Sequence, residues 1–142
     1  MPVKEGLIMF YGDSYFTRWS NDYQNDNMED VILSKDGSQA VINHGLGGAC
    51  FDQLLYYYPR MVRAYKPKYL VLKSYGNDHY YGYTTNEILM LMARICQYAR
   101  LDGVEHIYII KPMPSFKGKD KPPRFPANMT QEITPSLSFN VK

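Results

Sequence analysis

The sequence predicts an α/β fold in which a central parallel sheet lies between layers of helices. Short apolar runs of strand length alternate with longer segments whose apolar residues recur every three or four positions, which is the pattern of strands alternating with helices. Three of the runs end directly at short segments of glycine and polar residues, at 12–14, 45–48 and 76–78. Because the carboxyl ends of parallel strands meet at one edge of the sheet, we expect these three segments to lie together.

The first half of the chain is expected to hold two strands. Leu7–Tyr11 is a continuous apolar run, which suits a strand buried on both faces. Residues 21–30 are rich in Asn and Asp, which favours a surface loop or an irregular helix. The second strand is expected at Ala40–Asn43, and it runs into a glycine-rich turn at His44–Gly48.

A helix is expected over Phe51–Tyr65, with Pro59 predicting a kink or an early break. One face of this helix carries an apolar stripe made of Leu54, Leu55, Tyr58, Met61, Val62 and Tyr65. A third buried strand is expected at Tyr69–Leu72.

A second long helix is expected from Thr84, which has the spacing of a capping box with Glu87. It ends near Asp102–Gly103, and its inward residues are Ile88, Leu91, Met92, Ile95 and Tyr98. A fourth strand follows at His106–Ile110. Later residues have no convincing period, so we expect an α/β domain over 1–116 and an irregular tail over 117–142.

Composition limits the classes of function. The 142 residues fit one domain, and a net charge of +2 without a basic block gives no reason to expect a nucleic acid partner. No apolar run approaches the ~20 residues that span a bilayer, and no signal segment is recognised, so the expected location is cytoplasmic and no membrane contact is predicted. Cys50 and Cys96 are expected to be buried free thiols. No cofactor and no metal site is predicted.

Tyrosine is unusually frequent, with 14 copies. For the cluster Tyr56–Tyr58 we favour packing of the rings in the protein interior. The cluster Tyr80–Tyr83 follows the third glycine and polar segment, so either packing or an aromatic rim on a pocket remains open there.

The three strand-end segments resemble the sequence blocks of the SGNH (GDSL-type) hydrolases, a family of esterases and lipases. Phe10–Ser14 matches the family's Gly-Asp-Ser block, Ile42–Gly48 its Asn-x-Gly-x-Gly-Gly block, and Tyr75–Asp78 its Gly-x-Asn-Asp block. Residues 110–115 also look like the end of the family's fourth strand. The resemblance covers about residues 5–116 and implies a three-layer α/β/α, flavodoxin-like sandwich with strand order 2-1-3-4-5.

The resemblance implies a role for each matching residue. Ser14 would be the nucleophile, and the oxyanion would be bound by its own backbone N–H, the Gly48 N–H and the Asn77 amide. Each residue taken alone has a structural alternative, since glycines serve turns and Asn77 can cap a loop. We also expect substrate contacts at this edge from Asp13, Tyr75, Asp78 and Tyr80, and the expected substrate is a small acyl ester or an acetylated carbohydrate.

One block of the family is missing. Its Asp-x-x-His, which supplies the general base and the residue that orients it, occurs nowhere in the sequence. We therefore expect the fifth strand and last helix to be absent and activity to be weak. His106 opens a strand at the opposite end, and His44 is expected to bond locally. His79 is a candidate surrogate base, oriented by Asp78 or another carboxylate, although adjacent residues usually point apart.

Three functions follow from these patterns. The first is a serine ester hydrolase whose catalytic His and Asp are missing from the chain. The second is a non-catalytic remnant or binding module that uses the oxyanion pocket for a sugar or acyl ligand. The third is a nucleotide or phosphate binder built on Gly45–Gly48, which ranks last because no Gly-Lys-Ser/Thr pattern is present.

The fourth strand also predicts self-association. Without a fifth strand, His106–Ile110 would form an open edge with unpaired backbone groups. We therefore expect a homodimer that buries this strand.

Overall fold

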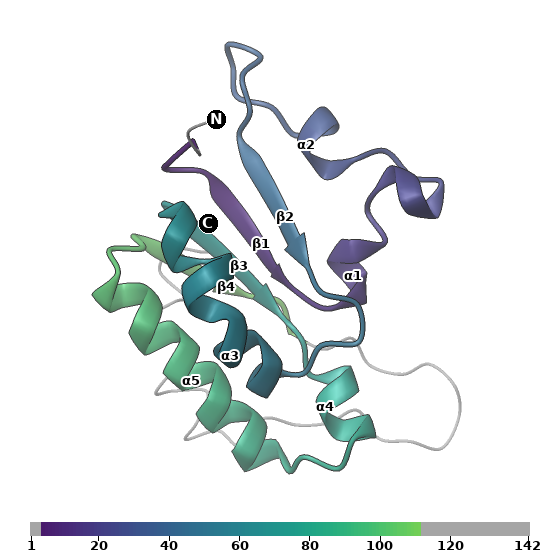
Figure 1. Ribbon diagram of the computed structural model, residues 1–142, viewed down its shortest axis with the longest axis vertical. Coiled ribbons are helices and arrows are strands. Elements are labelled where there is room, and N and C mark those ends of the chain that lie inside the picture. The colour runs from purple at the N-terminus through teal and green to yellow at the C-terminus, as the bar shows by residue number, and fades with distance from the viewer. Residues whose placement is uncertain (1–3, 112–142) are drawn as a thin grey trace.

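The computed structural model describes residues 4–111, and within them a parallel sheet is flanked by helices (Figure 1). The four strands lie in the order β2-β1-β3-β4, and each neighbouring pair is parallel. Their bounds are β1 (Ile8–Gly12), β2 (Val41–Gly45), β3 (Tyr69–Lys73) and β4 (His106–Ile109). The predicted α/β class is confirmed, with the first four strands in the predicted order. The tail predicted over 117–142 lies outside the described residues.

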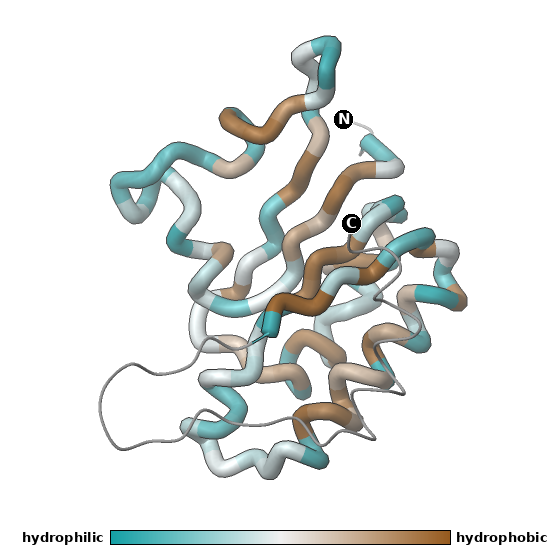
Figure 2. The backbone as a smooth tube through the Cα atoms, turned by 180° about the vertical axis from the view of Figure 1, so that it is seen from behind, coloured by the Kyte–Doolittle hydropathy of each residue, from teal (hydrophilic) through white to brown (hydrophobic). Residues whose placement is uncertain are grey.

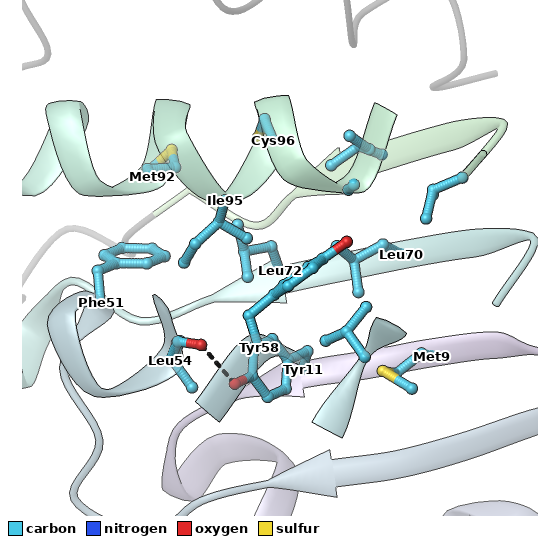
Figure 3. Packing of buried hydrophobic residues seen from close by; sticks show 14 of the residues in the cluster. Met9, Tyr11, Phe51, Leu54, Tyr58, Leu70, Leu72, Met92, Ile95 and Cys96 are labelled. Atoms are coloured by element: carbon cyan, nitrogen blue, oxygen red, sulfur yellow. Dashed lines mark hydrogen bonds between the residues drawn. The ribbon is translucent and has the colours of Figure 1, made fainter. Parts of the chain in front are cut away.

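Two long helices cover one face of the sheet, α3 (Phe51–Met61) and α5 (Thr85–Leu101). Both are amphipathic, and their apolar stripes pack against the side chains that alternate onto this face of β1 and β3. The Tyr11 hydroxyl donates a hydrogen bond to the Leu54 carbonyl at 2.6 Å (Figure 3). The resulting core includes Met9, Tyr11, Phe51, Leu54, Tyr58, Leu70, Leu72, Met92, Ile95 and Cys96.

Shorter elements pack against the other face, beside β1 and β2. They are α1 (Ser14–Thr17), the 3₁₀ turn η1 (Asn21–Tyr23) and α2 (Met28–Val31). Phe16 and Met28 are buried there with Val41. The connecting segments are mostly hydrophilic, whereas the strands are mostly hydrophobic (Figure 2). The polar segment 21–30 is thus a loop with short helical turns, as predicted.

The helices depart from the predicted pattern in two places. α3 runs through Pro59 and ends two residues later at Met61, and a 3₁₀ turn, η2 (Arg63–Tyr65), follows. Proline removes only one helical hydrogen bond, and the buried stripe holds the turns around it. α4 (Gly76–Tyr80), a helix of five residues, was not predicted because it carries no apolar period.

The predicted burial is right for most residues and wrong for part of the tyrosine cluster. Tyr58 is fully buried on the stripe, but Tyr56 is 67% exposed and Tyr57 is 39% exposed. Successive residues of a helix point about 100° apart, so neighbours of Tyr58 turn outward. Cys50 and Cys96 are free and buried as predicted. Among the described residues, no helix has the length and apolar character needed to cross a bilayer.

Candidate active site

Three segments begin side by side at the carboxyl ends of the strands. In the register of the sheet, Gly12 is paired with Gly45 on one side and with Lys73 on the other. After these positions, β1 is followed by α1, β2 by the loop before α3, and β3 by α4 (Figure 1). The sequence-predicted blocks are therefore brought to one edge of the sheet, as expected from their places after the strands.

Two glycines allow neighbouring backbone segments to approach closely at this edge of the sheet. A Cβ atom on Gly12 would lie 2.0 Å from the Lys73 carbonyl oxygen, and one on Gly45 would lie 2.4 Å from the Thr17 nitrogen. Both contacts are with backbone atoms, which cannot swing aside. Glycine is thus required sterically where β1 and β2 pass into the site.

Ser14 is the first residue of α1 and follows the N-cap residue Asp13. Asp13 Oδ1 accepts a hydrogen bond from the Tyr15 N–H at 3.0 Å, which holds the turn in place. Ser14 is half-buried. Within residues 4–111, neither its hydroxyl nor its backbone N–H has a hydrogen-bond partner, so both groups can engage a ligand.

The loop between β2 and α3 contributes Gly48. Its φ is +76°, a conformation that favours glycine, and nothing lies within 4 Å of the position of an added Cβ. Gly48 is exposed, and its N–H has no acceptor within residues 4–111. The Leu46 N–H donates to the Gly12 carbonyl at 2.7 Å, which ties this loop to the end of β1.

Asn77 is joined to the same loop. Its side-chain Nδ2 donates to the Ala49 carbonyl at 3.1 Å. Because a carbonyl only accepts, this contact fixes the nitrogen of the Asn77 amide toward the loop. The amide's second N–H has no partner among the described residues.

Asp78 is fully buried, and its carboxylate is engaged within the protein. Oδ1 accepts from Ser74 Oγ at 2.6 Å and from the Tyr75 N–H at 3.0 Å, while Oδ2 accepts from the Phe51 N–H at 2.8 Å. These bonds link the start of α3 to the start of α4. A substrate role for Asp78 stays a prediction, and so does that of Asp13, because both carboxylates are buried among internal partners.

The aromatic residues at α4 differ in exposure. Tyr75 is buried and has a φ of +107°, which is uncommon for a residue with a side chain. It stands where the Gly-x-Asn-Asp pattern has its glycine, a residue that adopts a positive φ without steric cost. Tyr80 is 83% exposed. The structure thus places Tyr80 on the surface beside the site and Tyr75 beneath it.

Within residues 4–111, none of the three histidines is hydrogen-bonded to Ser14. His44 Nδ1 bonds to the Met61 carbonyl at 2.7 Å, and burial lowers its pKa below the usual value. His106 opens β4 at the far end of the sheet. His79 is exposed, and its ring packs edge-on against Tyr75 with centroids 4.5 Å apart. Asp78 makes no bond to it, so the surrogate-base role remains an untested prediction.

Sequence reasoning missed Lys73, the last residue of β3. Its ammonium lies 2.9 Å from Asp13 Oδ2, and the two side chains are only 10% and 4% exposed. Lysine is almost never buried without a partner. The signal in the sequence is that this lysine comes directly after the apolar run Tyr69–Leu72, at the end of a buried strand. Within residues 4–111, no cluster of His, Cys, Asp or Glu is arranged to hold a metal ion.

Several solved structures with this fold are described as esterases or lipases. An acetyl xylan esterase, AlAXEase, superimposes with a TM-score of 0.72 over 90% of this chain and 72% of its own, at 15% identity. The SGNH-hydrolase family esterase AlinE4 gives 0.64 over 98% and 72%, at 19% identity. A GDSL-like lipase from Bacteroides thetaiotaomicron VPI-5482 gives 0.61 over 99% and 66%, at 17% identity. No protein-family model matches the sequence, and no curated protein matches it. These similarities establish the fold.

Proposed function

We propose that this chain is an ester hydrolase of the SGNH type, with Ser14 as the nucleophile and an oxyanion site made by the backbone N–H groups of Ser14 and Gly48 and the Asn77 amide. The substrate we propose is a small acyl or acetyl ester, including an acetylated carbohydrate. The acetyl xylan esterase among the structural neighbours supports this class. The exposed rings of Tyr15 and Tyr80 beside the site suit stacking on a sugar.

One observation carries the proposal. The three N–H donors belong to segments that are hydrogen-bonded to one another, and each has a hydrogen left without an acceptor within residues 4–111. Unused donors that are fixed in place are what an oxyanion site requires, because they stabilise developing charge without reorganising.

The reaction follows from this arrangement. Ser14 Oγ forms a bond to the acyl carbon, and the carbonyl oxygen takes up the negative charge among the three donors. The Ser14 proton passes to a base and then to the leaving alkoxide, so that the C–O bond to the alcohol breaks and acyl-Ser14 remains. Water then hydrolyses the acyl-Ser14 bond. The sequence has no Asp-x-x-His, so we propose that the chain performs these proton transfers slowly.

The test adds imidazole to the solution as the general base. Hydrolysis of p-nitrophenyl acetate is followed with and without imidazole for the wild type and Ser14→Ala, and acetyl-Ser14 is sought by intact mass. We expect imidazole to accelerate the wild type well beyond Ser14→Ala, because it replaces the missing proton acceptor. Equal rates for both proteins at every imidazole concentration would contradict the proposed role of Ser14 as the nucleophile.

A second candidate is a non-catalytic module that binds an acyl or sugar ligand with the same donors. It is favoured because His44 is bonded to the Met61 carbonyl and His106 opens β4 at the opposite end of the sheet, and within residues 4–111 neither ring is bonded to Ser14. In this case acetate or an acetylated sugar would shift the NMR signals of Gly48 and Asn77, while no acetyl-Ser14 would form.

A further inference from the structure

Asp13, Ser14 and Tyr15 form the turn at the start of α1, which we call the Ser14 turn. Within the described residues, Lys73 is the one buried lysine whose ammonium contacts this turn. It ends β3, and the alternation of the strand places its side chain on the face opposite Leu70 and Leu72. Its backbone carbonyl accepts the Asp13 N–H at 3.1 Å. The residue is 8% exposed, so its charge is largely removed from water.

The ammonium contacts both sequence neighbours of Ser14. It lies 2.9 Å from Asp13 Oδ2 and 3.8 Å from the centroid of the Tyr15 ring, which is an ion pair together with a cation–π contact. Asp13 Oδ1 in turn holds the Tyr15 N–H. No hydrogen bond joins Lys73 to Ser14 itself among residues 4–111.

The charge of this pair also bears on chemistry at Ser14. In the proposed reaction, negative charge develops beside the Ser14 N–H, one residue from the buried Asp13 carboxylate. Like charges repel, and the repulsion is stronger where one of them is buried, as Asp13 is. A cation bonded to Asp13 offsets that repulsion, whereas an unpaired carboxylate would oppose the oxyanion.

We propose that Lys73 is a positioning residue for Ser14: it fixes the turn through Asp13 and Tyr15 and compensates the Asp13 charge, so that the turn can accommodate an oxyanion. The inference rests on the proposed role of Ser14 only for its effect on rate. Its effect on the turn is independent of that role.

The test compares Lys73→Met, Asp13→Asn and the double variant with Lys68→Met. Lys68 is a matched control because it also has a carboxylate partner, Glu105 at 3.8 Å, and lies near the Tyr69 ring, but it is exposed at the far end of β3. The readouts are the imidazole-supported, Ser14-dependent rate on p-nitrophenyl acetate at temperatures where each variant is folded, and hydrogen exchange of the Tyr15 amide.

We expect Lys73→Met to lower the rate about tenfold or more and to speed Tyr15 exchange, while Lys68→Met changes neither. Asparagine keeps an acceptor for the Tyr15 N–H without the charge, so adding Lys73→Met to Asp13→Asn should lower the rate of Asp13→Asn by less than about threefold. A folded Lys73→Met protein with wild-type rate and exchange would overturn the inference, and so would a Lys73→Met effect that is as large in the Asp13→Asn background as in the wild type.

The two proposals fail differently. If wild-type Ser14 is inert even with imidazole, the proposed function is wrong, and Tyr15 exchange alone then decides the role of Lys73. Faster exchange in Lys73→Met than in Lys68→Met would still support the role of Lys73 in holding the turn, and equal exchange would refute it.

Discussion

The side-chain amide of Asn77 is anchored to the Ala49 carbonyl at 3.1 Å, one residue beyond Gly48. This bond joins the third strand-end segment to the loop that carries the second oxyanion donor. It also leaves one N–H of the amide without a partner among the described residues. The proposed oxyanion site is therefore held together by a contact between two segments 28 residues apart in sequence.

Asn77→Ala is expected to lower the imidazole-supported, Ser14-dependent rate by about 10²–10³-fold, the usual effect of removing one oxyanion donor. The rate on p-nitrophenyl acetate measures this. Asn86→Ala, an exposed asparagine in the first turn of α5, is the control and should leave the rate unchanged. A loss below about threefold for Asn77→Ala would remove Asn77 from the oxyanion site.

Gly12→Ala is expected to reduce the free energy of unfolding by about 3 kcal/mol or more, because the new methyl group would collide with the Lys73 carbonyl. Gly48→Ala should cost about 1–2 kcal/mol, since its φ is positive but its surroundings are open. Gly47→Ala, with open surroundings and no positive φ, should change stability by under about 0.5 kcal/mol. Urea unfolding measures all three, and a different order of effects would contradict the steric explanation.

Stability should fall as the pH is lowered through the range in which His44 titrates. Burial lowers the pKa of His44, and the Met61 carbonyl and Glu29 only partly oppose this. A histidine whose pKa is lower when folded binds its proton more weakly than in the unfolded chain, so protonation favours unfolding. The contribution is complete above the unfolded value of about 6.5 and is lost as the pH falls to the lower folded pKa. Urea midpoints from pH 7.5 to about 5 measure it.

His44→Gln is the matching variant for this titration. It should show a shallower fall in stability over the same pH range because the titrating ring is gone. The fall should be the same in an Asn86→Ala control, which changes an exposed residue that does not titrate. Parallel curves for His44→Gln and the wild type would assign the pH dependence to other groups.

We propose that two copies of the chain pair through β4. Within residues 4–111, β4 is bonded only to β3, so its other side presents backbone donors and acceptors. Sedimentation equilibrium over a concentration series should show a dimer, and Ile110→Lys should weaken it by placing charge at this edge. Leu101→Lys, at an exposed position on α5, should not. A wild type that stays monomeric at every concentration would refute the proposal.

The sequence by itself determined the four strands, the two long helices and their order along the chain. The apolar periods at Leu54–Val62 and Ile88–Tyr98 and the capping box at Thr84 are local signals, and local geometry converts them directly into helices. The blocks at Ser14, Gly48 and Asn77 follow strands, and a parallel sheet gathers strand ends at one edge whatever the loops contain. The short helix α4 was not predicted because it has no apolar period.

Only the tertiary structure decided which side chains bond to one another. Lys73 and Asp13 are 60 residues apart, and Asp78 and Phe51 are 27 apart. No local period encodes such pairs, since they depend on which strands are neighbours and on how each loop turns after its strand. The fold also decided that Asp13 and Asp78 are buried with internal partners, while the Ser14, Gly48 and Asn77 donors keep hydrogens unused among the described residues. The physical reason is desolvation. A buried carboxylate has lost its water and needs donors within the protein, whereas an N–H at an open edge can bond to water until a ligand replaces it.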